Sequence, residues 1–276
     1  MNLSGQIAII TGGGRGLGQA FAIALADAGV HVVITSRSEN ELRDTVKRIE
    51  QQRGAATFIT ADVTDPEATQ QVIATVEQQV GPIDLLINNA GSLRALGVIS
   101  EIDAEEWWRE IEINLRGPFL YTKAVLPKMI ERGQGRIINV ASGAGLFSIN
   151  TGSAYCVSKA ALIRLTESTA IETEAYGIKV FAIHPGTVRT PMNDHLYQSP
   201  EVKARAPEIQ QAFQQRYATN DLTPIEQSVD LVLQLAAGQA DALSGCYIDV
   251  NDDISELTRQ SEIIQKEDRR KLRMQL

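Results

Sequence analysis

Short apolar runs rich in β-branched residues alternate with longer amphipathic stretches along this chain of 276 residues. Such runs are typical of parallel strands that are buried on both faces. The stretches between them, Gly16–Ala28 and Glu39–Arg53 for example, are long enough to form crossover helices. We therefore predict an α/β fold, a doubly wound parallel sheet of about seven strands with helices on both faces. The expected strands are Ile7–Thr11, His31–Thr35, Ala56–Thr60, Ile83–Asn88, Gly135–Val140, Ile178–His184 and Cys246–Val250.

A glycine-rich segment follows the first expected strand directly and leads into the first expected helix. It reads Thr11-Gly12-Gly13-Gly14-Arg15-Gly16-Leu17-Gly18. Glycines allow a tight turn that brings the backbone close to a pyrophosphate, and the helix N-terminus then offers free N–H groups and a favourable dipole. The order of strand, turn and helix favours a dinucleotide-binding loop over a simple tight turn. The expected cofactor contacts here are Gly12, Arg15, Gly16, Leu17 and Gly18.

The chain resembles the short-chain dehydrogenase/reductase family in this loop and in the motifs that follow it in the family's order. These motifs are Asp62-Val63, Asn88-Asn89-Ala90-Gly91, Tyr155-Cys156-Val157-Ser158-Lys159 and Pro185-Gly186-Thr187-Val188-Arg189-Thr190. The resemblance extends from about Leu3 to Val250. It implies a Rossmann-like domain and an NAD(P)-dependent oxidoreductase, which moves a hydride between the nicotinamide ring and a carbonyl or alcohol carbon.

Tyr155 and Lys159 stand four residues apart, so they share one face of a helix. A free tyrosine has a pKa near 10 and is a poor base at neutral pH. A nearby ammonium favours the phenolate, so we expect Lys159 to lower the pKa of Tyr155. The phenol could then give a proton to a carbonyl oxygen, or take one from an alcohol. The resemblance implies these roles, and it implies that Lys159 also hydrogen-bonds the nicotinamide ribose.

Two further catalytic residues are implied by the resemblance. Ser142 stands 13 residues before Tyr155 and would hold the substrate oxygen with its hydroxyl. The local sequence alone favours a helix-capping or turn serine, and the series of motifs favours the catalytic role. Asn114 lies in an expected helix although asparagine is a mediocre helix former. The matching family asparagine disturbs its helix and holds a water in a proton relay to the lysine.

The other motifs are expected to contact the cofactor. The resemblance assigns the adenine to Asp62 and Val63, and the nicotinamide side to a loop that contains Pro185, Gly186, Val188 and Thr190. It also implies that the backbone of three residues lies close to the adenine ribose, namely Asn89, Ala90 and Gly91.

The end of the second expected strand predicts which cofactor is preferred. NAD-specific folds commonly place an acidic side chain there, on the ribose 2′-hydroxyl. Here Ser36 takes that place, Arg37 follows, and Arg15 lies in the glycine loop. Two guanidinium groups beside a hydroxyl suit a 2′-phosphate, so we predict that NADP(H) is preferred over NAD(H). The alternative is that both arginines are solvated surface charges.

Two segments depart from the alternation of strands and helices. No strand pattern occurs from 187 to 223, a stretch interrupted by Pro191, Pro200 and Pro207. This segment is either a lid-like insertion or a pair of surface helices. The charged stretch 254–276 is either a docked terminal helix or a partly disordered tail. We therefore expect a dinucleotide-binding and catalytic domain over residues 1–253 and a tail over 254–276.

Composition narrows the partners. The formal charge of -8 argues against a nucleic-acid partner. Two cysteines without a CxxC pair predict reduced thiols in a cytoplasmic protein, and no His/Cys cluster has metal-ligand spacing. We see no secretory signal and no apolar run long enough to span a membrane. The last expected strand lacks the Asp-Gly-Gly run of many relatives, which puts the usual homotetramer in doubt and leaves a homodimer expected.

The expected substrate is a small carbonyl or alcohol compound. Candidate residues facing it are Leu93, Arg94, Ala144, Leu146, Thr187, Met192 and Tyr197. The leading hypothesis is an NADPH-dependent ketone or 3-oxoacyl-type reductase. The alternatives are an NAD-dependent alcohol, sugar or steroid dehydrogenase of the same fold, or a cofactor-sensing protein that has lost the chemistry.

Overall fold

A seven-stranded sheet forms the centre of the molecule, in the order β3-β2-β1-β4-β5-β6-β7. In this computed structural model, which describes residues 3–274, every neighbouring pair of strands is parallel. The strands are β1 Ile7–Thr11, β2 His31–Ser36, β3 Ala55–Thr60, β4 Leu85–Asn88, β5 Gly135–Val140, β6 Ile178–His184 and β7 Tyr247–Asp249. The predicted doubly wound sheet is confirmed. The strand order reverses between β1 and β4, which is where such sheets open a binding crevice.

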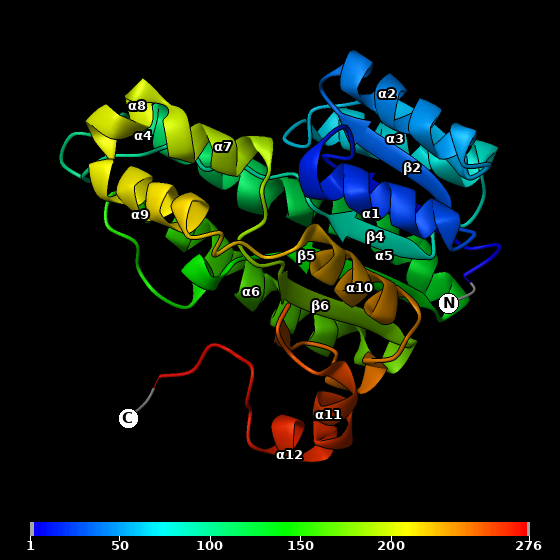
Figure 1. Cartoon of the computed structure of the whole chain (residues 1–276). Coiled ribbons are helices and arrows are strands. Elements are labelled where there is room, and N and C mark those ends of the chain that lie inside the picture. Colours follow the sequence, from blue (N-terminus) through cyan, green and yellow to red (C-terminus); the bar gives the residue numbers. More distant parts are fainter. Residues whose placement is uncertain (1–2, 275–276) are drawn as a thin grey trace.

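Helices cover both faces of the sheet, as expected (Figure 1). One face carries α1 Gly16–Asp27, α2 Glu39–Gln51 and α10 Ile225–Ala236. The other carries α3 Pro66–Gln79, α5 Gly117–Arg132 and α6 Ser153–Thr173. Leucine, isoleucine, valine and phenylalanine side chains from the sheet and these helices form the two main cores. This packing fixes the strand ends on which the site depends.

Several predicted boundaries differ from the structure by one or two residues, and three of them have a clear local reason. β4 begins at Leu85 because the N–H of Ile83 donates to the Glu77 carboxylate at 3.0 Å instead of joining the sheet. β7 begins after Cys246, whose N–H closes a turn on the Leu243 carbonyl. α2 ends at Gln51, and Arg53 then adopts a left-handed conformation with a φ of 65°, which no α-helix continues through.

The segment after β6 folds into three helices, α7 Pro191–Gln198, α8 Pro200–Arg205 and α9 Pro207–Ala218. Each begins with a proline in its first turn, where the missing N–H costs no hydrogen bond. The prolines therefore start helices and do not mark loops, so the surface-helix alternative describes the segment better. The helices share an apolar cluster with Leu93 and Leu96, which follow β4. They lie together at one end of the sheet (Figure 1).

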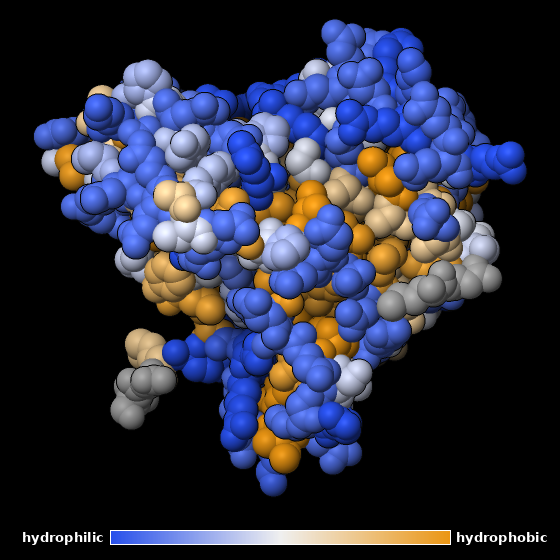
Figure 2. All heavy atoms as spheres, in the orientation of Figure 1, coloured by the Kyte–Doolittle hydropathy of each residue, from blue (hydrophilic) through white to orange (hydrophobic). Residues whose placement is uncertain are grey.

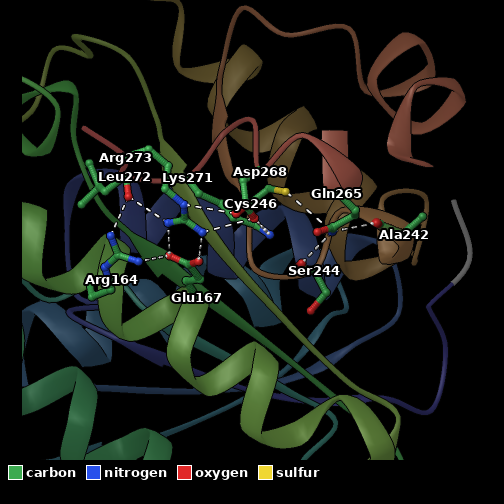
Figure 3. A network of polar contacts seen from close by, with 10 residues as sticks. All are labelled: Arg164, Glu167, Ala242, Ser244, Cys246, Gln265, Asp268, Lys271, Leu272 and Arg273. Atoms are coloured by element: carbon green, nitrogen blue, oxygen red, sulfur yellow. Dashed lines mark hydrogen bonds and ion pairs between the residues drawn. The ribbon is translucent and has the colours of Figure 1, made fainter. Parts of the chain in front are cut away.

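The described part of the tail is docked on the rest of the chain. Ile254 and Leu257 of α11 (Ile254–Arg259) and Ile264 of α12 (Ser261–Lys266) are buried in the main core. Beyond them Arg273 donates to both oxygens of Glu167 on α6, at 2.6 and 3.2 Å (Figure 3). Of the two alternatives for this segment, the docked one holds through Arg273.

Candidate active site

The predicted site residues meet along the carboxyl edge of the sheet. This follows from parallel strands, whose carboxyl ends all reach the same edge. The residues that end or follow successive strands there are Gly12, Ser36, Asp62, Asn89, Ser142 and Pro185. Helix α6 and the helical region before α5 bring Asn114, Tyr155 and Lys159 to the same edge.

The glycine loop is held in a tight cradle. Gly12 and Gly16 have φ values of 68° and 56°, in the left-handed region that favours glycine. A Cβ on Gly18 would lie 2.3 Å from the Gly12 carbonyl oxygen, so only glycine fits. The Asn89 amide donates to the carbonyls of Thr11 and Gly12 at 2.9 and 3.3 Å. Asn89 therefore fixes the loop through its side chain, a role that the sequence did not predict.

The loop after β6 faces the glycine loop. A Cβ on Gly16 would lie 3.6 Å from Thr190, in ordinary van der Waals contact. The Thr190 hydroxyl accepts from the N–H of Asn193 and so caps α7. Gly186 has a φ of 82° and packs directly on Thr223. Two other predicted residues complete this loop, Pro185 and the buried Val188.

The predicted 2′-phosphate residues lie at the outer end of the edge. The side chains of Arg15 and Arg37 are 61% and 71% exposed. Arg15 pairs with Glu41 at 3.2 Å, whereas Arg37 lies 4.0 Å from Asp62. The sequence did not reveal Glu41, because the first turn of α2 brings it back against Gly14.

Asp62 is already engaged by protein groups. One oxygen accepts from the backbone N–H and the hydroxyl of Thr64, at 3.0 and 2.8 Å, and the other pairs with Arg109 at 2.8 Å. Burial raises the pKa of Asp62, but the bonds from Thr64 and the charge of Arg109 outweigh it, so the pKa falls below its usual value. Neighbouring Val63 packs against Gly117, where a Cβ would approach within 2.9 Å.

Tyr155 and Lys159 project from the same face of α6, as the spacing predicts. The Lys159 ammonium lies 5.6 Å from the centroid of the Tyr155 ring. It donates to the carbonyl of Val140, the last residue of β5, at 2.8 Å. The lysine is only 4% exposed, and Tyr155 is half-buried. The pair thus joins α6 to the end of the central sheet.

The expectation that Lys159 lowers the pKa of Tyr155 is wrong for this structure. Burial raises the pKa of Tyr155 to about 12, and a hydrogen bond with Ser142 opposes that rise only in part. Burial lowers the pKa of Lys159 to about 8, against the favourable charge of Glu110. Removal from water and the nearby charge of Glu110 therefore decide the pKa of this phenol.

Ser142 and Asn114 are fixed by short hydrogen bonds. Ser142 accepts from the N–H of Ala144 at 3.2 Å and hydrogen-bonds Tyr155, so it is both a turn cap and a neighbour of the phenol. Asn114 lies in a π-helical turn, Glu112–Arg116, in line with the disturbed helix that the resemblance implies. Its side chain accepts from and donates to the backbone of Ser92, at 2.7 and 2.8 Å.

Sequence reasoning missed Glu110, a carboxylate that is 2% exposed beside these residues. It lies on α4 (Ala104–Ile111), and one of its oxygens accepts from the N–H groups of Arg94 and Ala95 at 2.6 and 2.9 Å. In the sequence it belongs to a charged amphipathic stretch, where a glutamate normally faces water. No local signal marks it as buried.

The expected substrate-facing residues fall in different places. Arg94 lines a cleft of about 670 Å³ with Pro191, Asp194, His195, Gln198, Ser199 and Pro200. Leu93 and Met192 pack in one apolar cluster with Tyr155. Tyr197 instead stacks on Tyr217, with ring centroids 4.5 Å apart. Of the remaining three, Ala144 is buried, Leu146 is exposed, and Thr187 is bonded to Thr223.

A model of the short chain dehydrogenase family matches residues 6–201. The chain belongs to this family. It is 39% identical over 189 residues to a short chain dehydrogenase of Pseudocercospora fijiensis, which covers 68% of this chain and 61% of that relative. It is 34% identical over 252 residues to trans-4-hydroxycyclohexanecarboxylate dehydrogenase of Sinomonas cyclohexanicum, covering 89% of this chain and 91% of that protein.

A solved actinorhodin polyketide ketoreductase with NADPH has the same fold. Its TM-score is 0.81 at 30% identity, and the match covers 92% of this chain and 99% of that chain. This member of the family is therefore an oxidoreductase of the NAD(P)-dependent type. Across residues 3–274 no helix combines the length and apolarity needed to cross a bilayer. The same residues contain no group of three or more His, Cys, Asp or Glu side chains that could hold a metal ion.

Proposed function

We propose that the protein reduces the carbonyl group of a small molecule with NADPH, using Tyr155 as the proton donor. The observation that carries this proposal is the meeting of Tyr155, Lys159 and Ser142 at the end of β5, beside the glycine cradle. The substrate class is a ketone or 3-oxoacyl-type compound. The similar actinorhodin polyketide ketoreductase with NADPH supports this assignment.

The residues present fit a dinucleotide. Gly12 and Gly18 keep bare backbone where a side chain would collide, and Gly16 has a left-handed φ that favours glycine, so the cradle suits a pyrophosphate. Lys159 would donate to the nicotinamide ribose, and the Thr190 hydroxyl, which accepts one bond as a cap, keeps its own proton to donate. When bound, the cofactor supplies the hydride.

The protonation state of Tyr155 at neutral pH suits it to act as the acid in carbonyl reduction. With a pKa of about 12 the phenol is neutral, so it can donate its proton to a carbonyl oxygen. Ser142 would bond the same oxygen and orient it. The reverse reaction needs the phenolate, and the ammonium of Lys159 is the group that would stabilise it. Asn114 would hold the water through which Lys159 regains a proton.

The preference for NADP(H) rests on the two exposed arginines. Both arginine side chains are mostly exposed, and ion pairs of exposed side chains are worth about 0–1 kcal/mol. A 2′-phosphate can therefore displace both carboxylates and bind the guanidinium groups bidentately. Ser36 supplies a neutral hydroxyl where NAD-specific folds commonly have an acid.

The test is kcat/KM for NADPH and for NADH with one shared ketone. We expect NADPH to be favoured, and Ser36→Asp with Arg37→Ala to reverse the preference. Glu41→Gln frees Arg15 and should strengthen the preference for NADPH. Glu39→Gln is the control, because Glu39 lies in the same helix but pairs with Arg43, and it should leave the preference unchanged. Equal values for both cofactors in the wild-type protein would refute the preference and leave the proton donor untouched.

A second candidate function is an NAD(P)-dependent dehydrogenase of a hydroxy acid. Similarity to trans-4-hydroxycyclohexanecarboxylate dehydrogenase favours it, and Arg94 at the cleft could bind a carboxylate. A panel of ketones, 3-oxoacyl thioesters, diketones and cyclic keto acids separates the candidates. The dehydrogenase is supported if hydroxy acids are oxidised faster than any ketone is reduced.

We also propose that the protein is a homo-oligomer of the cytoplasm. Exposed apolar side chains on α4, α5 and α6, Trp108, Phe119, Val157 and Ile171, support a homodimer or homotetramer. Figure 2 shows a band of apolar surface that descends from α10 toward the tail helices, where Ile263 is 51% exposed. Two free cysteines, Cys156 and Cys246, support a reducing cytoplasm. Sedimentation and a thiol titration test these points.

A further inference from the structure

Glu110 and Asn114 hold the same short segment of chain after β4. The Asn114 side chain accepts from the N–H of Ser92 and donates to its carbonyl. Glu110 accepts from the N–H groups of Arg94 and Ala95. The Ser92 hydroxyl also donates to Glu110 at 3.5 Å. Two side chains four residues apart thus fasten the segment that carries Leu93 and Arg94 to the substrate side of the site.

This segment lies beside the catalytic lysine. A Cβ on Gly91 would lie 3.3 Å from the Asn114 side-chain oxygen and 3.7 Å from the Lys159 nitrogen. Lys159 thus lies next to Gly91, Glu110 bonds the residues that follow it, and the two charges interact. Among residues 3–274, its second oxygen, Oε1, is buried without a hydrogen-bond partner. A fixed carboxylate with a free oxygen is thus buried near a buried ammonium.

Among the groups around Glu110, Lys159 is the cation that interacts with its carboxylate. From α6, the charge of Lys159 favours ionised Glu110, and the charge of Glu110 disfavours ionisation of Tyr155. From the segment after β4, Ser92 offers its hydroxyl, and Arg94 offers its backbone while its side chain faces water. On α4 itself Arg109 turns away to Asp62.

We propose that Glu110 is a positioning residue that keeps Lys159 charged in its buried site, and so sets the upper pH limit of catalysis. The inference rests on the roles proposed above for Tyr155 and Lys159. A buried lysine tends to lose its proton, because burial disfavours the charged form. A fixed carboxylate nearby opposes that loss, and an uncharged amide of the same shape does not.

The direct test is the titration of Lys159 in the wild-type protein and in Glu110→Gln. The glutamine oxygen still accepts from the backbone of Arg94 and Ala95, so the segment stays held while the charge is lost. In cofactor-free protein labelled with ¹³C at lysine Cε, we expect the Lys159 midpoint to lie near pH 8 in the wild type. In Glu110→Gln it should fall by about one pH unit. Lys159→Arg identifies the resonance.

Kinetics supply the second measurement. In Glu110→Gln the pH at which kcat falls on the alkaline side should be lower by about one pH unit, as for the Lys159 midpoint. At pH 6 kcat should stay near that of the wild type. Glu105→Gln, an exposed glutamate of the same helix, should change neither measurement. Glu110→Ala, which also releases the segment, should raise the substrate KM at every pH. Melting curves establish that each variant is folded.

An unchanged Lys159 midpoint in folded Glu110→Gln overturns the proposal, and so does a loss of kcat that is equal at all pH values. Either result would make Glu110 a structural clamp only. Failure of the proposed function has a different signature, since Tyr155→Phe would then keep its turnover whatever Glu110 does.

Discussion

The two ends of α6 present a contrast between two buried carboxylates. Near the start of the helix, Glu110 is 2% exposed and is held by two backbone N–H groups and the Ser92 hydroxyl. Near its end, Glu167 is 5% exposed and is bound by Arg164 and, through both oxygens, by Arg273 of the tail (Figure 3). At the start of α6, which we call the active end, Glu110 lies near the amine of Lys159. At the other end, which we call the tail end, Glu167 is paired with two arginines.

The difference shows in the pKa values of the two acids. Burial raises the pKa of Glu110, and the bonds from Ala95 and Arg94 together with the charge of Lys159 do not cancel it. Hydrogen bonds from Arg273 lower the pKa of Glu167 despite its burial. Burial alone therefore does not reveal what a carboxylate does. The partners decide whether the charge anchors the fold or acts on a neighbouring group.

The largest effect is expected at the active end. Tyr155→Phe removes the transferable proton and keeps the ring, so kcat should fall by about 10²–10⁴-fold. Cofactor should still bind, which fluorescence titration measures. Tyr176→Phe, an exposed tyrosine in the turn Glu174–Tyr176 after α6, is the matched control and should keep full activity. A kcat within tenfold of wild type in Tyr155→Phe would remove the phenol from the mechanism.

The second effect separates the two functions of the amine. Lys159→Ala should lower kcat and also weaken cofactor binding by about 10–100-fold, because a charged donor to the ribose is lost. Lys179→Ala on β6 removes a lysine outside the site and should change neither quantity. Cofactor affinity that stays at the wild-type value would confine Lys159 to the proton transfer.

The tail end should respond in stability and not in turnover. Arg273→Ala breaks two bonds to Glu167 and leaves Arg164 in place, which should cost about 1–3 kcal/mol of unfolding free energy. Removing all of 254–276 is a poorer test, since Ile254, Leu257 and Ile264 belong to the main core. Urea unfolding gives the cost, and kcat at 25 °C should equal that of the wild type. A lost kcat in a folded variant would place the tail in a site.

The sheet, the family and the motif residues could be predicted from the sequence, because they depend on local pattern. Apolar runs mark buried parallel strands, and the glycine loop needs glycine at fixed places, as the cradle of Gly12 and Gly18 shows. The three helices after β6 are harder to predict, since a proline interrupts most patterns but here occupies the first turn of each helix.

The sequence does not predict which charged side chains tertiary packing brings to the site. Glu110, Arg109 and Glu41 are ordinary members of amphipathic helices in the sequence, and only the packing of those helices brings them to the site. The pKa of Tyr155 was misjudged for the same reason. Its rise to about 12 depends on how deeply α6 is buried, which the four-residue spacing to Lys159 does not encode.

The smallest effect tests the contrast most directly, because the two acids should change stability with pH in opposite directions. The folded pKa of Glu167 lies below its usual value near 4.5, so its charge stabilises the fold above that pH and the contribution is lost as pH falls. The folded pKa of Glu110 lies above 4.5, so its contribution is complete below that pH and is lost as pH rises through the raised value.

Unfolding free energies of Glu110→Gln and Glu167→Gln, measured from pH 3 to pH 8 against the wild type, should therefore diverge. The Glu110 variant should gain relative to the wild type as pH rises above 4.5, because the glutamine never carries the disfavoured charge. The Glu167 variant should lose relative to the wild type as pH rises toward 4.5 and stay level at higher pH, because its arginines are left without a carboxylate. Parallel curves for the two variants would show that both glutamates are simple anchors, and the distinction between the ends of α6 would fail.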